Sequence, residues 1–201
     1  ISRTMKKLLS ALFALALASC VPSTGSTNAS LTSPEGLKDA QALLADNFAK
    51  YDGKIVAVGF SVDADDHIDM VDVTYKEGSK ATAASYVVYT KQVIESNPYA
   101  GLEAEKGLKV SDFKVTELTS LVEKAKALIA EKDKNFTDFR AHKLEYEVQA
   151  DGSLLTRFVV YANNANTSYF GKRVDAGKPV FAFSFEADTA GNVKAVSGLE
   201  L

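Results

Sequence analysis

The stretch Lys143–Tyr161, KLEYEVQADGSLLTRFVVY, decides the fold class. Its first part alternates apolar and polar side chains, with Leu144, Tyr146 and Val148 as the apolar set. The turn dipeptide Asp151-Gly152 follows, and then the apolar run Leu154–Tyr161. Alternation with a period of two residues is typical of a strand with one buried face. Two such runs joined by a short turn predict an antiparallel hairpin.

Working outward, β-rich runs predict further strands at 54–62, 68–75, 84–93, 180–186 and 193–197. Apolar residues recur at helical spacing in two segments. The first helix should have Ser33 as N-cap and Pro34 as first residue, and should end at Asp52-Gly53. The second should span Thr116–Lys134, with Ser120 and Glu123 as a capping box.

The predicted fold class is therefore α+β, with amphipathic helices packed on antiparallel β-sheet meanders, cystatin-like or PepSY-like in shape. The order helix, hairpin, strand occurs twice, and FSVDADD (60–66) resembles YEVQADG (146–152). This favours a tandem repeat within one α+β domain at 33–201, with halves at 33–110 and 111–201. Convergent turn chemistry in two unrelated hairpins is the alternative.

Composition limits the chemistry that the chain can perform. Of 201 residues, 46% are hydrophobic and 24% charged, with one Cys and two His. A single Cys excludes an internal disulfide and multi-cysteine metal sites. The sequence contains no GxSxG, GxGxxG or GxxxxGK[ST] motif. We therefore expect no cofactor and no enzymatic activity.

The N-terminal segment carries targeting signals. Met5-Lys6-Lys7 supplies positive charge, and Leu8–Ala18 is an apolar run of 11 residues, whereas a membrane span needs about 20. We expect residues 1–19 to be a signal peptide, with Ile1–Thr4 as extra residues before the initiator Met5. Leu17-Ala18-Ser19-Cys20 resembles the lipobox of bacterial lipoproteins. That resemblance implies lipidation of Cys20 and cleavage before it; an ordinary secretory signal is the alternative.

After Cys20, residues 20–32 are rich in Ser, Thr, Gly and Asn, which predicts a flexible tether. The net charge is −3, and removing residues 1–19, which carry three cations and no acid, makes it −6. An acidic surface argues against nucleic-acid partners and against electrostatic attachment to anionic lipid. Acyl chains on Cys20 would therefore provide the membrane attachment. Val21 stands where an Asp would retain an enteric-type lipoprotein at the inner membrane, so we expect the outer membrane.

Two loops and one His are candidate sites. Oxygen ligands in Asp63–Asp72 could hold Ca²⁺, although a solvated hairpin turn is the favoured interpretation and no metal site is predicted. Asn164, Asn166, Tyr169 and Phe170 form the candidate ligand-binding loop, because amides next to aromatic rings suit a sugar or a peptide. A core strand is the alternative there. His142 has no nucleophile signature near it.

The leading hypothesis is a non-catalytic binding or structural lipoprotein of the bacterial cell envelope, with an envelope or extracellular protein as partner. A stripe of aromatic residues is predicted to be core (Phe158, Phe181, Phe183, Phe185, Tyr146 and Tyr161). If helices cover only part of that face, the protein could instead carry a small apolar ligand there. An envelope hydrolase is the third, disfavoured hypothesis.

Overall fold

The helix α1 (Pro34–Phe48) begins where the sequence predicts. In the computed structural model, which describes residues 29–100, 106–164 and 180–199, Ser33 Oγ accepts a hydrogen bond from the Gly36 N–H at 3.0 Å. This bond satisfies one of the free N–H groups of the first helical turn. One face of α1 is buried (Leu37, Ala40, Leu44 and Phe48), and a 3₁₀ turn at Ala49–Tyr51 follows.

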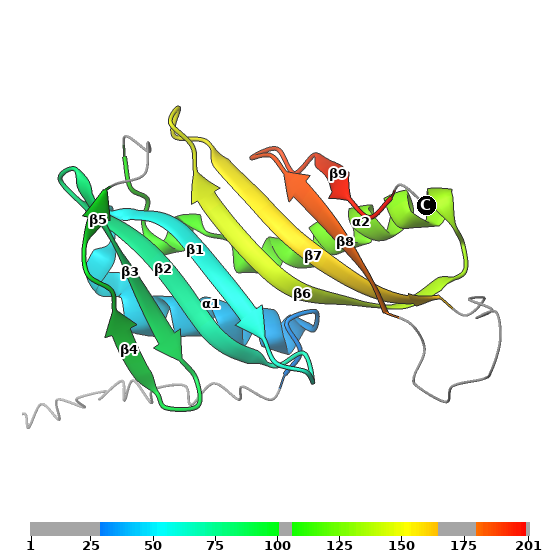
Figure 1. Cartoon of the computed structure of the whole chain (residues 1–201), viewed down its shortest axis with the longest axis horizontal. Helices are drawn as coiled ribbons and strands as arrows, with labels where there is room; N and C mark the ends of the chain where they lie inside the picture. Colours follow the sequence, from blue (N-terminus) through cyan, green and yellow to red (C-terminus); the bar gives the residue numbers. More distant parts are fainter. Residues whose placement is uncertain (1–28, 101–105, 165–179, 200–201) are drawn as a thin grey trace, which may run out of the picture.

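The described strands form one antiparallel sheet with the order β4-β3-β2-β1-β6-β7-β8-β9, and β5 pairs with β3 (Figure 1). Their bounds are Ile55–Val62, Ile68–Glu77, Lys80–Val87, Gln92–Glu95, Tyr99–Ala100, Phe136–Val148, Leu154–Asn164, Val180–Ala187 and Val193–Ser197 for β1 to β9. Both α1 and α2 (Leu118–Lys132) lie on the same side of the sheet. The predicted α+β class is confirmed.

A helix followed by sheet strands occurs on each side of the β1–β6 junction, α1 with β1 to β5 and α2 with β6 to β9. Gly59 pairs with Glu145, 86 positions further along the chain. The resembling segments 60–66 and 146–152 have the same offset. Buried helix positions also correspond, each 85 positions apart (Gly36, Leu37, Ala40 and Leu44 with Leu121, Val122, Ala125 and Ile129). The two helix-and-strand sets, called units here, share one sheet, and a tandem repeat between them stays a prediction.

The core lies between the helices and the sheet and is continuous across both units. Phe158, Phe183 and Phe185 are at most 1% exposed, and Phe158 stacks on Phe185 with ring centroids 5.4 Å apart. The prediction that these rings are core is confirmed for them. The prediction is wrong for Tyr161. Its neighbours Val160 and Ala162 are buried in the core, so the pleat of the strand directs the Tyr161 side chain to the opposite face of the sheet.

Two further sequence predictions are wrong. The segment 84–93 is not one strand, because the chain turns between β3 and β4, where Lys91 adopts a left-handed φ of 54°. The Ser120–Glu123 capping box does not exist either: α2 already begins at Leu118, so Ser120 lies inside the helix. The preceding 3₁₀ turn Val115–Glu117 leads directly into α2 and leaves no position for a separate cap.

Residues 30–32, close to the start of the described chain, form backbone and side-chain hydrogen bonds with both units. Ser30 forms a β-bridge with His67, and the Leu31 N–H donates to the Asp66 carbonyl at 3.2 Å. The Ala141 N–H of β6 donates to Thr32 Oγ1 at 3.0 Å. Leu31 is fully buried. This segment therefore belongs to the folded domain and not to the predicted tether. Neither described helix has the length and apolarity needed to cross a bilayer.

Candidate functional site

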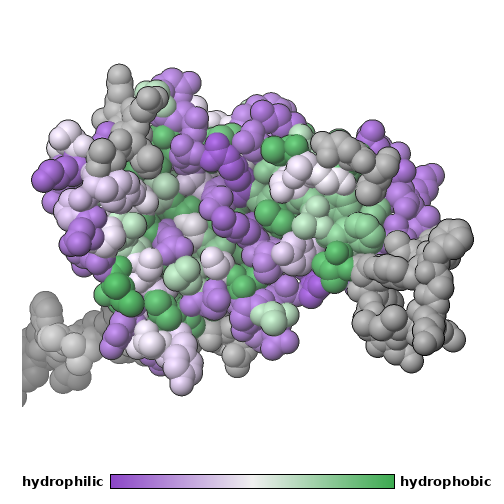
Figure 2. All heavy atoms as spheres, in the orientation of Figure 1, coloured by the Kyte–Doolittle hydropathy of each residue, from purple (hydrophilic) through white to green (hydrophobic). Residues whose placement is uncertain are grey.

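The sheet face opposite the helices, called the open face here, carries no helix in the described part of the chain (Figure 1). Figure 2 shows this face, where hydrophobic side chains lie on both sides of a central hydrophilic band. A sheet face that no helix covers is either solvated or available to a partner. The shape and charge of the open face therefore decide what it can do.

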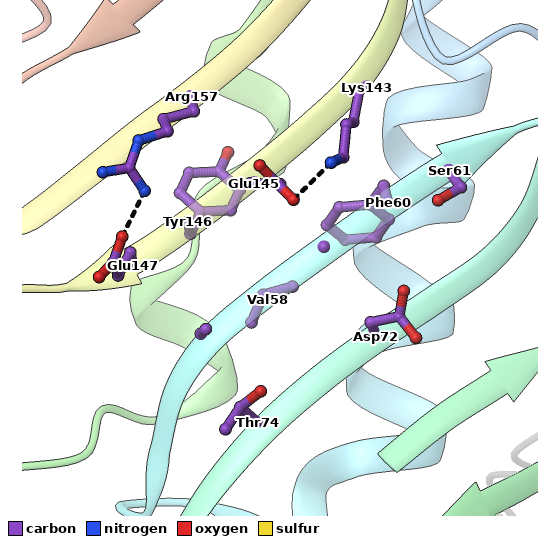
Figure 3. Close-up of a pocket in the computed structure, with 12 residues that line it drawn as sticks. Val58, Phe60, Ser61, Asp72, Thr74, Lys143, Glu145, Tyr146, Glu147 and Arg157 are labelled. Carbon is purple, nitrogen blue, oxygen red and sulfur yellow. Dashed lines mark hydrogen bonds and ion pairs between the residues drawn. The ribbon is translucent and has the colours of Figure 1, made fainter. Parts of the chain in front are cut away.

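A groove of about 370 Å³ runs along the central strand β1 on the open face (Figure 3). Its floor is formed by Ala57, Gly59 and Ser61, whose side chains are small or absent. Val58 and Phe60 alternate with them and are buried in the core. Because neighbouring strands are about 4.8 Å apart, small residues on a central strand leave a channel between the side chains of its two neighbours.

The walls of this channel come from β2, β6 and β7. On one side, Asp72 and Thr74 project from β2 (Figure 3). On the other side, Lys143, Glu145 and Glu147 project from β6, and Arg157 from the next strand, β7. The register places Gly59 directly between two acids, since it pairs with Asp72 on one side and Glu145 on the other. A molecule resting on Gly59 would therefore meet a carboxylate from each neighbouring strand.

The wall on the β6 side is a network of ion pairs. Lys143 Nζ lies 2.7 Å from Glu145 Oε1, and Arg157 pairs with both Glu147 and Glu186. Lys194 Nζ lies 3.0 Å from the other Glu186 oxygen. Hydrogen bonds from Lys194 and Arg157 lower the pKa of Glu186, and those to Glu147 and Glu186 raise the pKa of Arg157. Both shifts favour the charged forms of Glu186 and Arg157.

Asp72 on the opposite wall has a different environment. It accepts a hydrogen bond from the Ser85 hydroxyl of β3. Among the ion pairs of the described residues, none includes Asp72. The groove lining holds three carboxylates (Asp72, Glu145 and Glu147) and two cations (Lys143 and Arg157). One negative charge in the groove is thus left without a cation from its lining.

A second hollow of about 200 Å³ adjoins the groove across the ion-pair network. The two share Lys143, Glu145 and Arg157, which stand between them as a ridge. The lining of the second hollow includes apolar side chains, among them Val159 and the half-exposed Val196. The open face therefore offers an acidic groove and, next to it, a more apolar hollow.

The side chains of the groove lining set the chemistry that is available there. Its lining offers hydroxyls, from Ser61 and Thr74, but neither His nor Cys. A hydroxyl nucleophile needs a base within hydrogen-bonding reach. The carboxylates on the β6 wall are engaged with Lys143 and Arg157, and Asp72 accepts a hydrogen bond from the Ser85 hydroxyl.

Of the predicted ligand-binding residues, the structure describes Asn164 alone. Asn164, at the end of β7, is 7% exposed, and its Nδ2 donates to Asp133 Oδ2 at 2.8 Å. This bond joins β7 to the C-terminal end of α2. Asn166, Tyr169 and Phe170 lie outside the described residues, as does Cys20.

The Asp63–Asp72 stretch comprises the β1–β2 hairpin turn, residues 63–67, and the first residues of β2. Asp63 Oδ1 accepts the N–H groups of Asp65 and His67 at 2.9 and 3.0 Å, and the His67 N–H in particular lowers the Asp63 pKa. Ligand atoms of Asp63, Asp65 and His67 can converge within 4.8 Å, but Ca²⁺ takes six to eight oxygens. The side chains therefore stabilise a turn.

The prediction of a solvated turn is wrong for one residue, Asp66. Its side chain points inward, and the residue is only 8% exposed.

The ring of His142 stacks on the ring of Tyr161, with ring centroids 4.1 Å apart and planes 14° from parallel. Both rings belong to neighbouring strands β6 and β7.

Sequence reasoning missed the groove entirely. The available signal was the small side chain at alternate positions 57, 59 and 61 within an otherwise bulky strand. Its meaning depends on the register, because Asp72 and Glu145 are far from Gly59 in sequence and meet it only through the pairing of β1 with β2 and β6.

No family model matches the chain, and no curated protein matches it. Among solved structures, the chain is distantly similar to the crystal structure of a "putative lipoprotein" from Clostridium difficile 630. The two chains are 17% identical with a TM-score of 0.38, and the match covers 79% of this chain and 90% of the other.

Proposed function

We propose that this chain is a lipid-anchored protein of the bacterial cell envelope whose α+β domain binds another protein through the open face without catalysing a reaction. The groove along β1 carries the proposal. It combines a floor of small side chains, ion pairs along one wall and an adjoining hollow with apolar lining on one sheet face.

The anchor rests on the sequence. Cys20 is the single cysteine of the chain and stands at the end of Leu17-Ala18-Ser19, where the lipobox resemblance requires it. Two or three acyl chains would hold the protein at a membrane, since each buried CH₂ contributes about 0.8 kcal/mol. The domain begins by residue 30, so about ten residues separate Cys20 from the fold. The open face would therefore act close to the membrane surface.

Two of the functions considered from sequence lose support. The apolar-ligand carrier needs an exposed aromatic face, whereas Phe158, Phe183 and Phe185 are buried in the core. The hydrolase needs a nucleophile with a base, and the groove lining provides no His or Cys. Protein binding uses what the open face offers, namely charged and apolar contacts over a broad surface.

The finer proposal is attachment to the outer membrane, which rests on Val21 in place of a retaining Asp. The Clostridium difficile likeness gives it no support. Separation of inner and outer membranes by density, followed by detection of the native chain, tests this part. We expect the native chain to be recovered with the outer membrane, and a Val21→Asp variant to be recovered with the inner membrane.

Intact-mass spectrometry of the membrane fraction tests the anchor. The wild-type chain should carry a diacyl or triacyl mass increment, and a Cys20→Ala variant should lack it and leave the membrane. A wild-type mass that corresponds to unmodified cleavage, with the protein in the soluble fraction, would overturn the anchor.

Site-specific photo-crosslinking in cells tests the binding function. A benzoylphenylalanine residue at Thr74, on the groove wall, should give one discrete protein adduct. The matched control places the same residue at Lys38, which is exposed on α1. No adduct at Thr74, or equal adducts at both positions, would contradict docking on the open face.

A further inference from the structure

Gly59 lacks a side chain for no reason that the fold itself supplies. Its φ lies outside the left-handed region, and an added Cβ would meet only Asp72, with Cβ at 3.7 Å and Oδ2 at 4.0 Å. These are ordinary van der Waals separations. An alanine would therefore fit the folded chain at this position.

The other described glycines have local explanations. Five adopt a left-handed φ, and two would drive a Cβ into backbone atoms (Gly53, Gly78, Gly152, Gly191 and Gly198; Gly36 and Gly107). A glycine inside a strand weakens the strand, and it often marks a site where another molecule approaches the backbone closely. Gly59 is in the middle of β1, on the groove floor, so the approach is from the open face.

The chemistry around Gly59 selects the approaching group. Asp72 and Glu145 are its two cross-strand neighbours. Glu145 has Lys143 as partner, and Asp72 has only the Ser85 hydroxyl among the described contacts. The lining carries one more carboxylate than cations. A positive group over Gly59 would complete this charge pattern with charge-assisted hydrogen bonds.

We propose that the groove floor at Gly59 receives an Arg or Lys side chain of the protein partner, held between Asp72 and Glu145. This inference rests on the proposed protein-binding function. The groove is open to solvent, with Glu145 and Lys143 side chains 42% and 50% exposed, so a free cation would be well solvated there and weakly held. A partner adds contacts across the ridge, where Val159 and Val196 line the second hollow.

N-acetyl-arginine amide is the probe for this seat, titrated into the ¹⁵N-labelled full chain in detergent and followed by amide chemical shifts. The Gly59 and Asp72 amides should shift and saturate, whereas the neutral isostere N-acetyl-citrulline amide should leave them unchanged. Equal responses to both probes, or no response to either, would overturn the seat.

Three variants localise the effect. Asp72→Asn should weaken arginine-amide binding at least fivefold, and Gly59→Val should abolish it while keeping the thermal midpoint at or above that of the wild type. Glu77→Gln is the matched control, because it removes an acid from the same strand outside the groove. Unchanged binding in Gly59→Val would show that the probe binds elsewhere and would overturn the proposal.

The crosslink at Thr74 separates this inference from the function on which it rests. A partner adduct that forms equally in wild type, Asp72→Asn and Gly59→Val would leave docking intact and overturn the arginine or lysine seat. Probe binding without any adduct would show a site for free cations and overturn the protein partner. An adduct that requires both Gly59 and Asp72 would support the complete proposal.

Discussion

Arg140 Nη1 lies 3.0 Å from Asp66 Oδ2, which joins β6 of the second unit to the hairpin turn of the first. The side chain of Asp66 is 11% exposed and that of Arg140 is 35% exposed. The Asp66 carbonyl also accepts the Leu31 N–H. One turn residue therefore connects three segments that are distant in sequence.

Asp66→Asn should lower the free energy of unfolding by about 1–2 kcal/mol, because a largely buried charge-assisted contact is lost. Asn tolerates the left-handed φ of 64° at this position, so the backbone should stay as it is. Urea denaturation followed by circular dichroism measures the change. Glu77→Gln, which breaks the exposed pair with Lys54, should cost about 0–1 kcal/mol. Equal losses in both variants would contradict the linking role of Asp66.

Replacing Ser by Ala should have different effects on stability near the starts of the two helices. Ser33→Ala removes the α1 cap and should cost about 1 kcal/mol of stability. Ser120→Ala lies inside α2 on its exposed side and should be neutral or stabilising by about 0.5 kcal/mol, because Ala has the higher helix propensity. Thermal and urea unfolding of both variants measure this. A loss at Ser120 comparable to that at Ser33 would restore the rejected capping box.

Stability should fall at alkaline pH. Burial, followed by the hydrogen bond to Glu95, raises the pKa of Tyr51 to about 12, whereas an unfolded tyrosine titrates near 10. The native state therefore keeps a proton that the unfolded state releases. This contribution is complete below pH 10 and is lost as the pH rises through about 12, by at most about 1.4 kcal/mol per pH unit.

Tyr51→Phe should reduce this alkaline slope in urea unfolding measured between pH 9 and 12. Tyr89→Phe is the control, because Tyr89 is 94% exposed and its loss should leave the slope unchanged. An identical slope in wild type and both variants would assign the alkaline loss to other groups.

The two units should unfold together. Leu44 of α1 and Ile129 of α2 are fully buried in one continuous core, and β1 pairs with β6 across the junction. Leu44→Ala and Ile129→Ala should each lower the free energy of unfolding by about 2–5 kcal/mol, in one transition. Calorimetry together with amide exchange in both helices measures cooperativity. Two separate transitions, each shifted by one variant, would show that the units are independent.

Local patterns predicted much of the fold. Val71, Val73 and Tyr75 share the buried face of β2 as expected, and β9 has the predicted bounds. The strand β3 was placed too late, because its first half, Lys80–Ala84, is alanine-rich and lacks the bulky residues that indicate strands. The first part of β6, from Phe136, was missed because its apolar and polar residues do not alternate regularly there.

The candidate site could not be predicted in the same way. The groove depends on which residues the register places beside Gly59, and the inward turn of Asp66 depends on Arg140, 74 positions away. Likewise, the hydrogen bond from Asn164 to Asp133 could not be predicted, because it forms only where β7 meets the end of α2. Such relationships arise from tertiary pairing and not from neighbours in sequence.

The attachment of residues 30–32 to the joint between the units has a mechanical consequence. Any tension that enters the domain through the chain before Ser30 reaches the Ser30–His67 bridge, the Leu31–Asp66 bond and the Thr32–Ala141 bond first. The force is thereby delivered to both units at once, at the middle of the sheet. The free edges at β4 and β9 carry none of this initial load, so a pulled molecule would begin to yield at its centre.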